Sequence, residues 1–251
     1  MTGFYTSLAS VYDIVFPENR AATRFLADCL DRPGRILDLA CGTGTSALAL
    51  ARRGHEVSAV DLDETMIAKA REKDDSGTVA FFVGSFSDIE TLFPGGGFDL
   101  VYSIGNSIPH LSSRNDVACF VTAVSKLLAP GGLFVLQIVN FDRILHYNID
   151  ALPPIERLDH DITLVRNYRM RDDRLRVAFD TVLTVGGETT RHSVDLLTLT
   201  SGELVSMLSM AGFERINLFG GYDRSPFTVD SPAIVMKGTK GADSSDTGRS
   251  Y

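Results

Sequence analysis

The segment RILDLACGTGT, residues 35–45, constrains the fold of this 251-residue chain more than any other segment. Its apolar first half predicts a buried strand of a parallel sheet. Gly42 and Gly44 then predict a tight turn into a helix that begins near Thr45. Glycine suits such a turn because it tolerates positive φ and lets the backbone approach a ligand closely. The segment therefore predicts an α/β fold with a ligand at the turn.

Asp38 is the unusual residue of this strand, since it places a carboxylate among apolar side chains. A buried charge needs a partner. We expect a cationic ligand group, held by the loop directly or through water, to supply it. The sulfonium and ammonium groups of S-adenosylmethionine meet that requirement.

ILDLACGTG at residues 36–44 resembles the cofactor-binding motif of the class I S-adenosylmethionine-dependent methyltransferases. The same residues also fit the dinucleotide fingerprint of nicotinamide oxidoreductases, as Gly42-x-Gly44-x-x-Ala47 with Asp61 19 positions after Gly42. Two features favour the methyltransferase. Dehydrogenase strands are normally apolar where Asp38 stands, and the residues before Arg35 suffice for a helical cap. A turn that binds no ligand is the third alternative.

Composition limits the partners of the chain. A hydrophobic content of 44% supports one large core, and a net charge of −8 argues against nucleic acid or an anionic membrane as partner. We therefore expect a small-molecule acceptor. Three scattered cysteines fit a reducing, cytoplasmic compartment, and neither a signal peptide nor a membrane span is expected. The five histidines lack the spacing of metal ligands, so no metal is expected, and the oligomeric state is left open.

Alternating strand and helix patterns predict a doubly wound, Rossmann-like, seven-stranded and mostly parallel sheet. The expected strands lie at 35–40, 56–61, 79–83, 98–103, 133–139, 215–219 and 233–237, and the principal helices at about 45–53, 64–73, 115–128 and 201–212, the last capped by Ser201. Between them, stretches at about 161–170, 174–186 and 190–200 predict a small antiparallel β lid. The domains expected are an N-terminal helical cap (1–34), a core (35–142 and 201–240), the lid insert (143–200) and a disordered tail (241–251).

Polar residues at strand ends are the expected cofactor contacts, because ligands of doubly wound sheets bind at the carboxyl edge. Asp61 ends the second strand and can accept both hydroxyl protons of a ribose, while Asp63 is expected to cap the next helix. Met66 is interpreted either as an adenine contact or as a core residue. Related methyltransferases place an acid after the third strand, where this chain has Ser85, so Ser85, a backbone carbonyl or Asp88 would contact the adenine, with Phe86 as a stacking face.

Residues 98–111 and 137–145 resemble the corresponding segments of glycine and sarcosine N-methyltransferases, and the likeness extends over roughly residues 35–215. It implies that Ile104 contacts the methionine part of the cofactor and that Asn106 faces the acceptor. His110 is either an acceptor-side or a structural residue. Tyr5 and Tyr12 resemble the aromatic residues of that family's cap that close over the cofactor, with packing in the core as the alternative. Arg20 and Arg24 are both candidates to pair with the cofactor carboxylate. The full expectation is Asp38, Ala40, Gly42, Gly44, Asp61, Leu62, Met66, Ser85, Phe86, Ile104, Tyr12 and Arg20 at the cofactor, and Asn106, His110 and Tyr5 on the acceptor side, with no general base identified.

One departure from these enzymes affects the acceptor. They carry an arginine at the end of the fifth strand that grips the acceptor carboxylate, and Val139 occupies that position here. We therefore expect glycine to be a poor acceptor unless Arg166, Arg169 or Arg191 of the lid replaces that arginine. We also expect the lid to control acceptor access and not cofactor affinity. The predicted reaction is in-line methyl transfer to a small nucleophile, nitrogen more than oxygen, and the alternative from another class is a catalytically silent cofactor-binding protein.

Overall fold

A seven-stranded sheet forms the centre of the protein in the computed structural model, which describes residues 8–241. Its order is β10-β11-β5-β4-β1-β2-β3, and only β11 runs antiparallel to its neighbours. The predicted doubly wound, mostly parallel sheet is confirmed. The strands are β1 (Arg35–Leu39), β2 (Glu56–Asp61), β3 (Val79–Val83), β4 (Phe98–Ser103), β5 (Leu128–Val139), β10 (Phe213–Phe219) and β11 (Ala233–Lys240).

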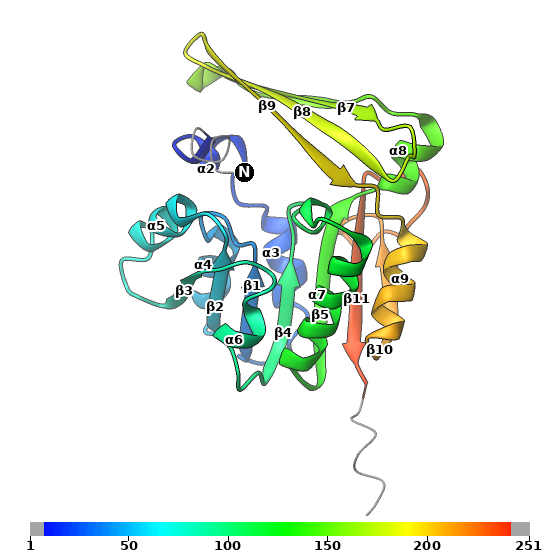
Figure 1. Ribbon diagram of the computed structural model, residues 1–251. Helices are drawn as coiled ribbons and strands as arrows, with labels where there is room; N and C mark the ends of the chain where they lie inside the picture. The colour runs from blue at the N-terminus through cyan, green and yellow to red at the C-terminus, as the bar shows by residue number, and fades with distance from the viewer. Residues whose placement is uncertain (1–7, 242–251) are drawn as a thin grey trace, which may run out of the picture.

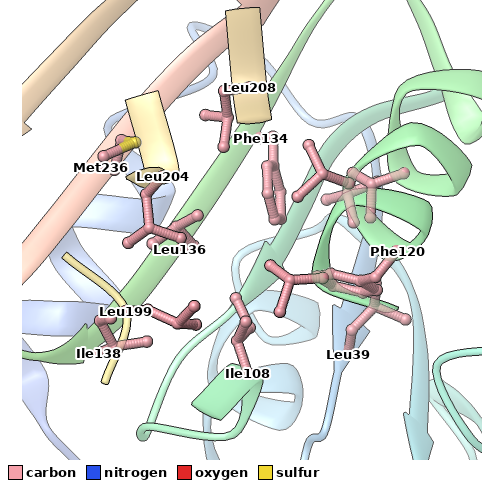
Figure 2. Close-up of a cluster of buried hydrophobic side chains, with 14 of the residues drawn as sticks. Leu39, Ile108, Phe120, Phe134, Leu136, Ile138, Leu199, Leu204, Leu208 and Met236 are labelled. Carbon is pink, nitrogen blue, oxygen red and sulfur yellow. The ribbon is translucent and has the colours of Figure 1, made fainter. Parts of the chain in front are cut away.

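Helices cover both faces of this sheet (Figure 1). Successive residues of a strand point to opposite faces, so Ile36 packs on one side and Leu37 on the other. Figure 2 shows the side that contains Phe134 and Leu136 of β5. The first face carries α3 (Arg20–Ala27), α4 (Thr45–Ala51) and α5 (Glu64–Glu72), and the second carries α6 (Ile89–Leu92), α7 (Arg114–Leu127) and α9 (Ser201–Met210).

Side-chain caps start the helices that follow the strands. The Asp63 carboxylate accepts hydrogen bonds from the backbone N–H groups of Thr65 (2.8 Å) and Met66 (3.2 Å), so the predicted cap of α5 is confirmed. The predicted cap of α9 is wrong by one residue. Thr200, not Ser201, is the N-cap, because its side chain and that of Glu203 each bond the other's backbone in a capping box.

A four-stranded antiparallel sheet lies above the carboxyl edge of the central sheet (Figure 1). The predicted antiparallel lid is confirmed, but the structure adds a fourth strand at its edge. Pro153 and Pro154 lie in that strand, at a register shift between Leu152 and Ile155, and an irregular edge is where a strand tolerates proline. The lid consists of β6 (Ala151–Arg157), β7 (Ile162–Met170), β8 (Arg176–Val185) and β9 (Glu188–Leu197), joined to the core by α8 (Phe141–Tyr147), and a one-turn helix η2 (Leu158–His160) links β6 to β7.

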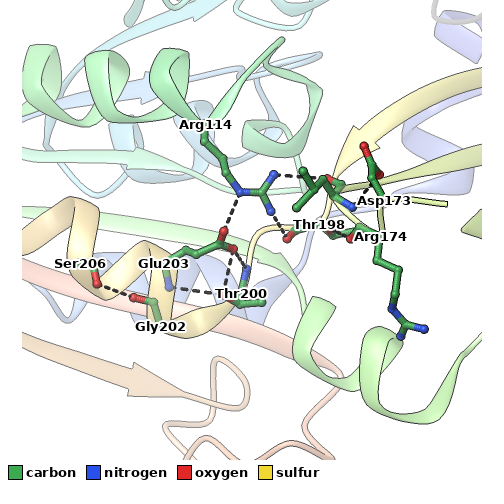
Figure 3. A network of polar contacts seen from close by, with 9 residues as sticks. Arg114, Asp173, Arg174, Thr198, Thr200, Gly202, Glu203 and Ser206 are labelled. Atoms are coloured by element: carbon green, nitrogen blue, oxygen red, sulfur yellow. Dashed lines mark hydrogen bonds and ion pairs between the residues drawn. The ribbon is translucent and has the colours of Figure 1, made fainter. Parts of the chain in front are cut away.

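Arginines fasten the base of the lid to the core (Figure 3). Arg114 of α7 donates to Glu203 Oε1 of α9 (2.6 Å) and to the carbonyl of Thr198, just after β9 (3.1 Å). Arg174, between β7 and β8, donates to the carbonyl of Leu145 in α8 (2.7 Å). The base of the lid is therefore bonded to α7 of the core and to the connecting helix α8.

The short helix α2 (Tyr12–Val15) lies between the core and the lid (Figure 1). On the core side, the Asp13 carboxylate accepts hydrogen bonds from Lys73 (2.8 Å) and Thr45 (3.2 Å). On the lid side, Arg157 of β6 donates to two carbonyl groups at the end of α2 (2.8 and 2.9 Å). Both layers thus hold α2 in place. Within residues 8–241, no helix has the length and apolar character needed to cross a membrane.

Candidate cofactor and acceptor site

A cavity of about 670 Å³ opens at the carboxyl ends of β1, β2, β3 and β4. This is the edge at which doubly wound sheets bind ligands. The predicted residues in its wall are Tyr12, Ala40, Gly42, Asp61, Leu62, Met66, Ser85, Phe86 and His110. Predicted residues that do not line it are Asp38, Gly44, Ile104, Asn106 and Arg20.

The two glycines of the turn have different roles. Gly42 (φ +55°) lines the cavity, and a Cβ atom there would lie 3.3 Å from the Tyr12 hydroxyl, which is also in the wall. Gly44 (φ +72°) faces the core, where a Cβ atom would lie 2.7 Å from the Phe81 ring. Of the two glycines expected at the ligand, Gly42 alone lines the cavity, and Gly44 permits close packing of the turn on β3.

Asp61 organises the turn as well as lining the cavity. Its carboxylate accepts hydrogen bonds from the backbone N–H of Gly42 (2.7 Å) and of Asp63 (2.9 Å). Burial raises the pKa of Asp61, while these two N–H donors oppose the shift. Each carboxylate oxygen has a second lone pair, so the side chain can also accept ribose hydroxyl protons. The 19-residue spacing between Gly42 and Asp61 in the sequence did not predict that the Asp61 carboxylate accepts a hydrogen bond from the glycine turn.

Asp38 has a partner inside the protein. The residue is 2% exposed, and the Tyr102 hydroxyl donates to its carboxylate at 2.7 Å. The argument that a ligand must supply this partner is therefore wrong. Burial raises the pKa of Asp38 to about 7, and the Tyr102 hydrogen bond works against that rise. Tyr102 stands directly opposite Asp38 in the pairing of β1 with β4, and it is the polar-tipped residue that sequence reasoning missed.

The expected adenine side is formed by residues after β2 and β3. Ser85 lines the cavity, but its hydroxyl donates to Asp88 (2.6 Å), whose side chain also accepts from the Ser85 N–H. Asp88 therefore closes a local turn and does not cap α6 with its side chain. Phe86 lines the cavity and packs against Phe120, with ring centroids 4.4 Å apart. Met66 is buried, as expected of a core residue, and also borders the cavity.

The expected acceptor side is formed by the loop after β4. The Asn106 side-chain oxygen accepts from the N–H of Val139 (2.9 Å), so the side chain joins the loop after β4 to the end of β5. His110 ends the one-turn helix η1 (Ile108–His110) and lines the cavity. Burial lowers the pKa of His110 to about 4, with a smaller contribution from His192 of the lid. At neutral pH the cavity wall therefore presents an uncharged imidazole.

The N-terminal helix closes one side of the cavity through Tyr12. Arg20 and Arg24 are both exposed on α3 and absent from the wall, so neither predicted cofactor partner lies in the cavity. Tyr5 and the predicted tail beyond residue 241 lie outside the described residues. Sequence reasoning missed Asp13, whose carboxylate also accepts from the Thr43 hydroxyl of the glycine turn. The one feature of the sequence that marks Asp13 is an acidic residue within a short, otherwise largely apolar helix.

The described part of the chain contains no cluster of side chains arranged as metal ligands. Over residues 8–241, no group of three or more histidine, cysteine, aspartate or glutamate side chains is arranged to hold an ion. The polar groups of the cavity are those suited to an organic ligand.

Comparison with known proteins identifies the class. Residues 36–132 match the family described as Methyltransferase domain. The chain is 28% identical over 243 residues to YqeM of Bacillus subtilis (strain 168), a protein named as a methyltransferase, covering 94% of this chain and 97% of YqeM. It is 28% identical over 145 residues to glycine N-methyltransferase of Mus musculus, which covers 53% of this chain and 49% of that enzyme. The CcbJ methyltransferase of Streptomyces caelestis has the same fold, with a TM-score of 0.81 and 23% identity over 94% of this chain and 96% of CcbJ.

The fold, the glycine turn and these relatives define a class I Rossmann-like methyltransferase. More specifically, the chain is an S-adenosylmethionine-dependent methyltransferase that resembles the glycine N-methyltransferases over about half their length. The site fits that cofactor. Gly42 leaves space beside Tyr12, Asp61 offers carboxylate lone pairs at the strand end, and Ser85 and Phe86 provide a polar and an aromatic surface.

Proposed function

We propose that this enzyme methylates a nitrogen atom of a small molecule. The observation that carries the proposal is a cavity of about 670 Å³ at the carboxyl edge of the central sheet, bounded on one side by Tyr12 of α2, on the side of the core that faces the lid (Figure 1). A cavity of that volume has room for small organic ligands. The net charge of −8 argues against a nucleic acid acceptor. A cytoplasmic location remains a prediction from the cysteine content.

A nitrogen acceptor is supported by His110. A neutral imidazole can accept a hydrogen bond from an amine N–H and so direct the nitrogen lone pair. Because burial keeps the pKa of His110 near 4, the side chain brings no positive charge toward a sulfonium. The likeness to glycine N-methyltransferase points in the same direction.

The protein contributes chiefly positioning. S-adenosylmethionine supplies an already activated methyl group when bound, so proximity and exclusion of water account for much of the catalysis. Asp61 would hold the ribose, Gly42 and Tyr12 would shape the cofactor side, and His110 would orient the acceptor. The lid and α2 would keep water out.

Isotope transfer tests the proposal. The full chain is incubated with a metabolite extract and methyl-deuterated S-adenosylmethionine, and labelled products are found by mass spectrometry. Fragmentation should place the label on nitrogen. The Asp61→Ala variant should form the product at least tenfold more slowly at limiting cofactor, since it loses one or two charge-assisted hydrogen bonds of about 1.5 to 3 kcal/mol each. Asp75→Ala, which removes an exposed acid that does not line the cavity, is the matched control.

Two results would contradict the proposal. Label on oxygen or carbon would overturn the nitrogen assignment. Absence of any labelled product, with tight binding of S-adenosylmethionine, would favour the catalytically silent alternative.

A further inference from the structure

The charged side chains that line the cavity all carry negative charge. Within residues 8–241 they are Asp61, Asp63, Glu90 and Asp116. His110, in the same wall, is uncharged at neutral pH because burial lowers its pKa to about 4. A cleft lined by one sign of charge concentrates ions of the opposite sign. The cavity therefore favours a positively charged ligand over an anionic one.

Three of these four carboxylates have partners in the protein. Asp61 accepts hydrogen bonds from two backbone N–H groups, and Asp63 caps α5. Glu90 forms an ion pair with Lys126 at 3.0 Å. Among the described residues, no donor is bonded to the carboxylate of Asp116. Asp116 is therefore the acid of the wall that has no role yet in the fold or at the cofactor.

The half-buried Asp116 stands in the first turn of α7, three residues after the N-cap Ser113. An acid at that position can close a capping box by accepting the N–H of the N-cap residue, as Glu203 does for Thr200 in α9. Within the described part of the chain, the Asp116 side chain makes no such bond. Its contribution to the fold is then the favourable placement of an acid near a helix N-terminus.

Asp116 continues the acceptor side of the cavity. The wall runs from His110 through Leu111 and Ser112, just before α7, to Asp116. Along α7 it includes the residues three, four and seven positions further on, which are Cys119, Phe120 and Ala123. This spacing places all four side chains on one face of the helix. An acceptor whose reacting nitrogen lies at His110 can therefore meet Asp116 with another part of its structure.

The arginines expected to bind an acceptor carboxylate lie elsewhere. Side chains alternate along a strand, so Arg166 shares the inner face of β7 with the buried Leu164 and Tyr168. Arg169 is exposed on the outer face of β7, and Arg191 of β9 is exposed as well. None of these three arginines lines the cavity. The charge on the acceptor side is thus opposite to that of a carboxylate-binding site.

We propose that Asp116 binds a positively charged group of the methyl acceptor, so that the acceptor is a diamine or another amine with a second cationic centre. This inference rests on the proposed function for its reaction but not for its binding site. An ammonium group would donate a charge-assisted hydrogen bond to the carboxylate, at a distance from the nitrogen that receives the methyl group. Asp116 is then a specificity-determining residue, and His110 keeps its contact with the reacting nitrogen.

Cation binding can be tested without turnover. The enzyme saturated with S-adenosylhomocysteine is titrated calorimetrically, at pH 7.5 and constant ionic strength, with 1,4-diaminobutane, 4-amino-1-butanol and 4-aminobutanoic acid. These three amines have the same chain length and differ in the charge of the second group. The diamine should bind at least tenfold more tightly than the amino alcohol, and the amino acid should bind most weakly. The three-carbon and five-carbon sets are titrated too, and equal affinity for diamine and amino alcohol at every length would overturn the inference.

Two matched variants assign the effect to one carboxylate. Asp116→Asn should reduce the preference for the diamine to less than threefold. Glu64→Gln should keep it, because Glu64 is an exposed acid in the first turn of α5 that does not line the cavity. Both variants should melt within about 4 °C of wild type, as expected for one acid near a helix N-terminus. A tenfold loss of S-adenosylhomocysteine affinity in Asp116→Asn alone would show that Asp116 serves the cofactor and would overturn the inference.

Kinetics then connect Asp116 to the reaction. In a series whose members are methylated, the diamine should exceed the amino alcohol at least tenfold in kcat/KM. Asp116→Asn should raise the KM of the diamine at least tenfold and change kcat less than threefold, since the carboxylate binds a group remote from the reacting nitrogen. Preference for the amino acid would overturn the inference and leave the methyltransferase activity intact. If the metabolite extract yields no nitrogen-methylated product, the proposed function fails, while the titrations still decide whether Asp116 binds a cation.

Discussion

The two glycines of the turn offer a sharp test of how sequence motif and structure correspond. We expect Gly44→Ala to reduce stability and Gly42→Ala to reduce cofactor affinity. At Gly44 the new Cβ would lie 2.7 Å from the Phe81 ring at φ +72°. The left-handed backbone costs about 1 to 2 kcal/mol and the overpacking about 1 to 3 kcal/mol more, so the free energy of unfolding should fall by roughly 2 to 5 kcal/mol.

At Gly42 the backbone cost is similar, but the contact is milder. The Cβ would lie 3.3 Å from the Tyr12 hydroxyl, which the side chain can relieve by a small movement. Because this atom stands in the cavity wall, cofactor affinity should fall at least tenfold, about 1.4 kcal/mol. Thermal unfolding should show a fall of roughly 5 to 20 °C for Gly44→Ala and of less than about 8 °C for Gly42→Ala.

Calorimetric titration with S-adenosylhomocysteine, carried out well below both melting temperatures, completes the comparison. Gly44→Ala should bind within about threefold of wild type once folded. The reasoning is refuted if Gly42→Ala is the less stable variant, or if Gly44→Ala loses more affinity than Gly42→Ala.

Three further predictions concern the supports of the site. Asp38→Asn should become more stable relative to wild type as pH rises from about 4 to about 7, because a folded-state pKa of about 7 against an ordinary 3.8 means that ionisation of Asp38 destabilises the wild type over that range. The same difference in melting temperature between variant and wild type at pH 5 and at pH 8 would contradict this. Asn140→Ala should lower the melting temperature by roughly 5 to 15 °C, since Asn140 is fully buried and its amide donates to three backbone carbonyls, and an unchanged melting temperature would count against that role. Asp13→Asn should increase the dissociation rate of S-adenosylhomocysteine several-fold by weakening the contact between α2 and Lys73. Asp28→Asn, at the C-terminal end of α3, is the control, and equal dissociation rates for the two variants would show that other contacts hold α2 in place.

The core could be predicted because its information is local. The run from Arg35 to Thr45 combines an apolar strand, a glycine turn and a helix start, and each signal comes from neighbouring residues. The same holds for the cap at Asp63. The edge strand β6 was missed because Pro153 and Pro154 oppose a strand in isolation, and only pairing with β7 makes one possible there.

The site was less predictable because its contacts join distant segments. The carboxylate of Asp38 was correctly predicted to be buried, but its partner lies 64 positions away on β4. Asn106 was expected to face the acceptor, yet its side-chain oxygen accepts from a backbone N–H 33 positions away. Nothing in the local pattern distinguishes Arg166 from Arg169, since the face of β7 that turns inward depends on where the lid packs.

The position of α2 has a consequence for how cofactor binding and acceptor binding affect each other. The helix is bonded to the glycine turn through Asp13 and to the lid through Arg157, so one short segment belongs to both halves of the site. Binding free energies coupled through a shared element are reciprocal. If acceptor and cofactor are coupled through α2, the acceptor must therefore strengthen cofactor binding by the same factor by which the cofactor strengthens acceptor binding. The affinities for the two ligands are in that sense one property of this fold.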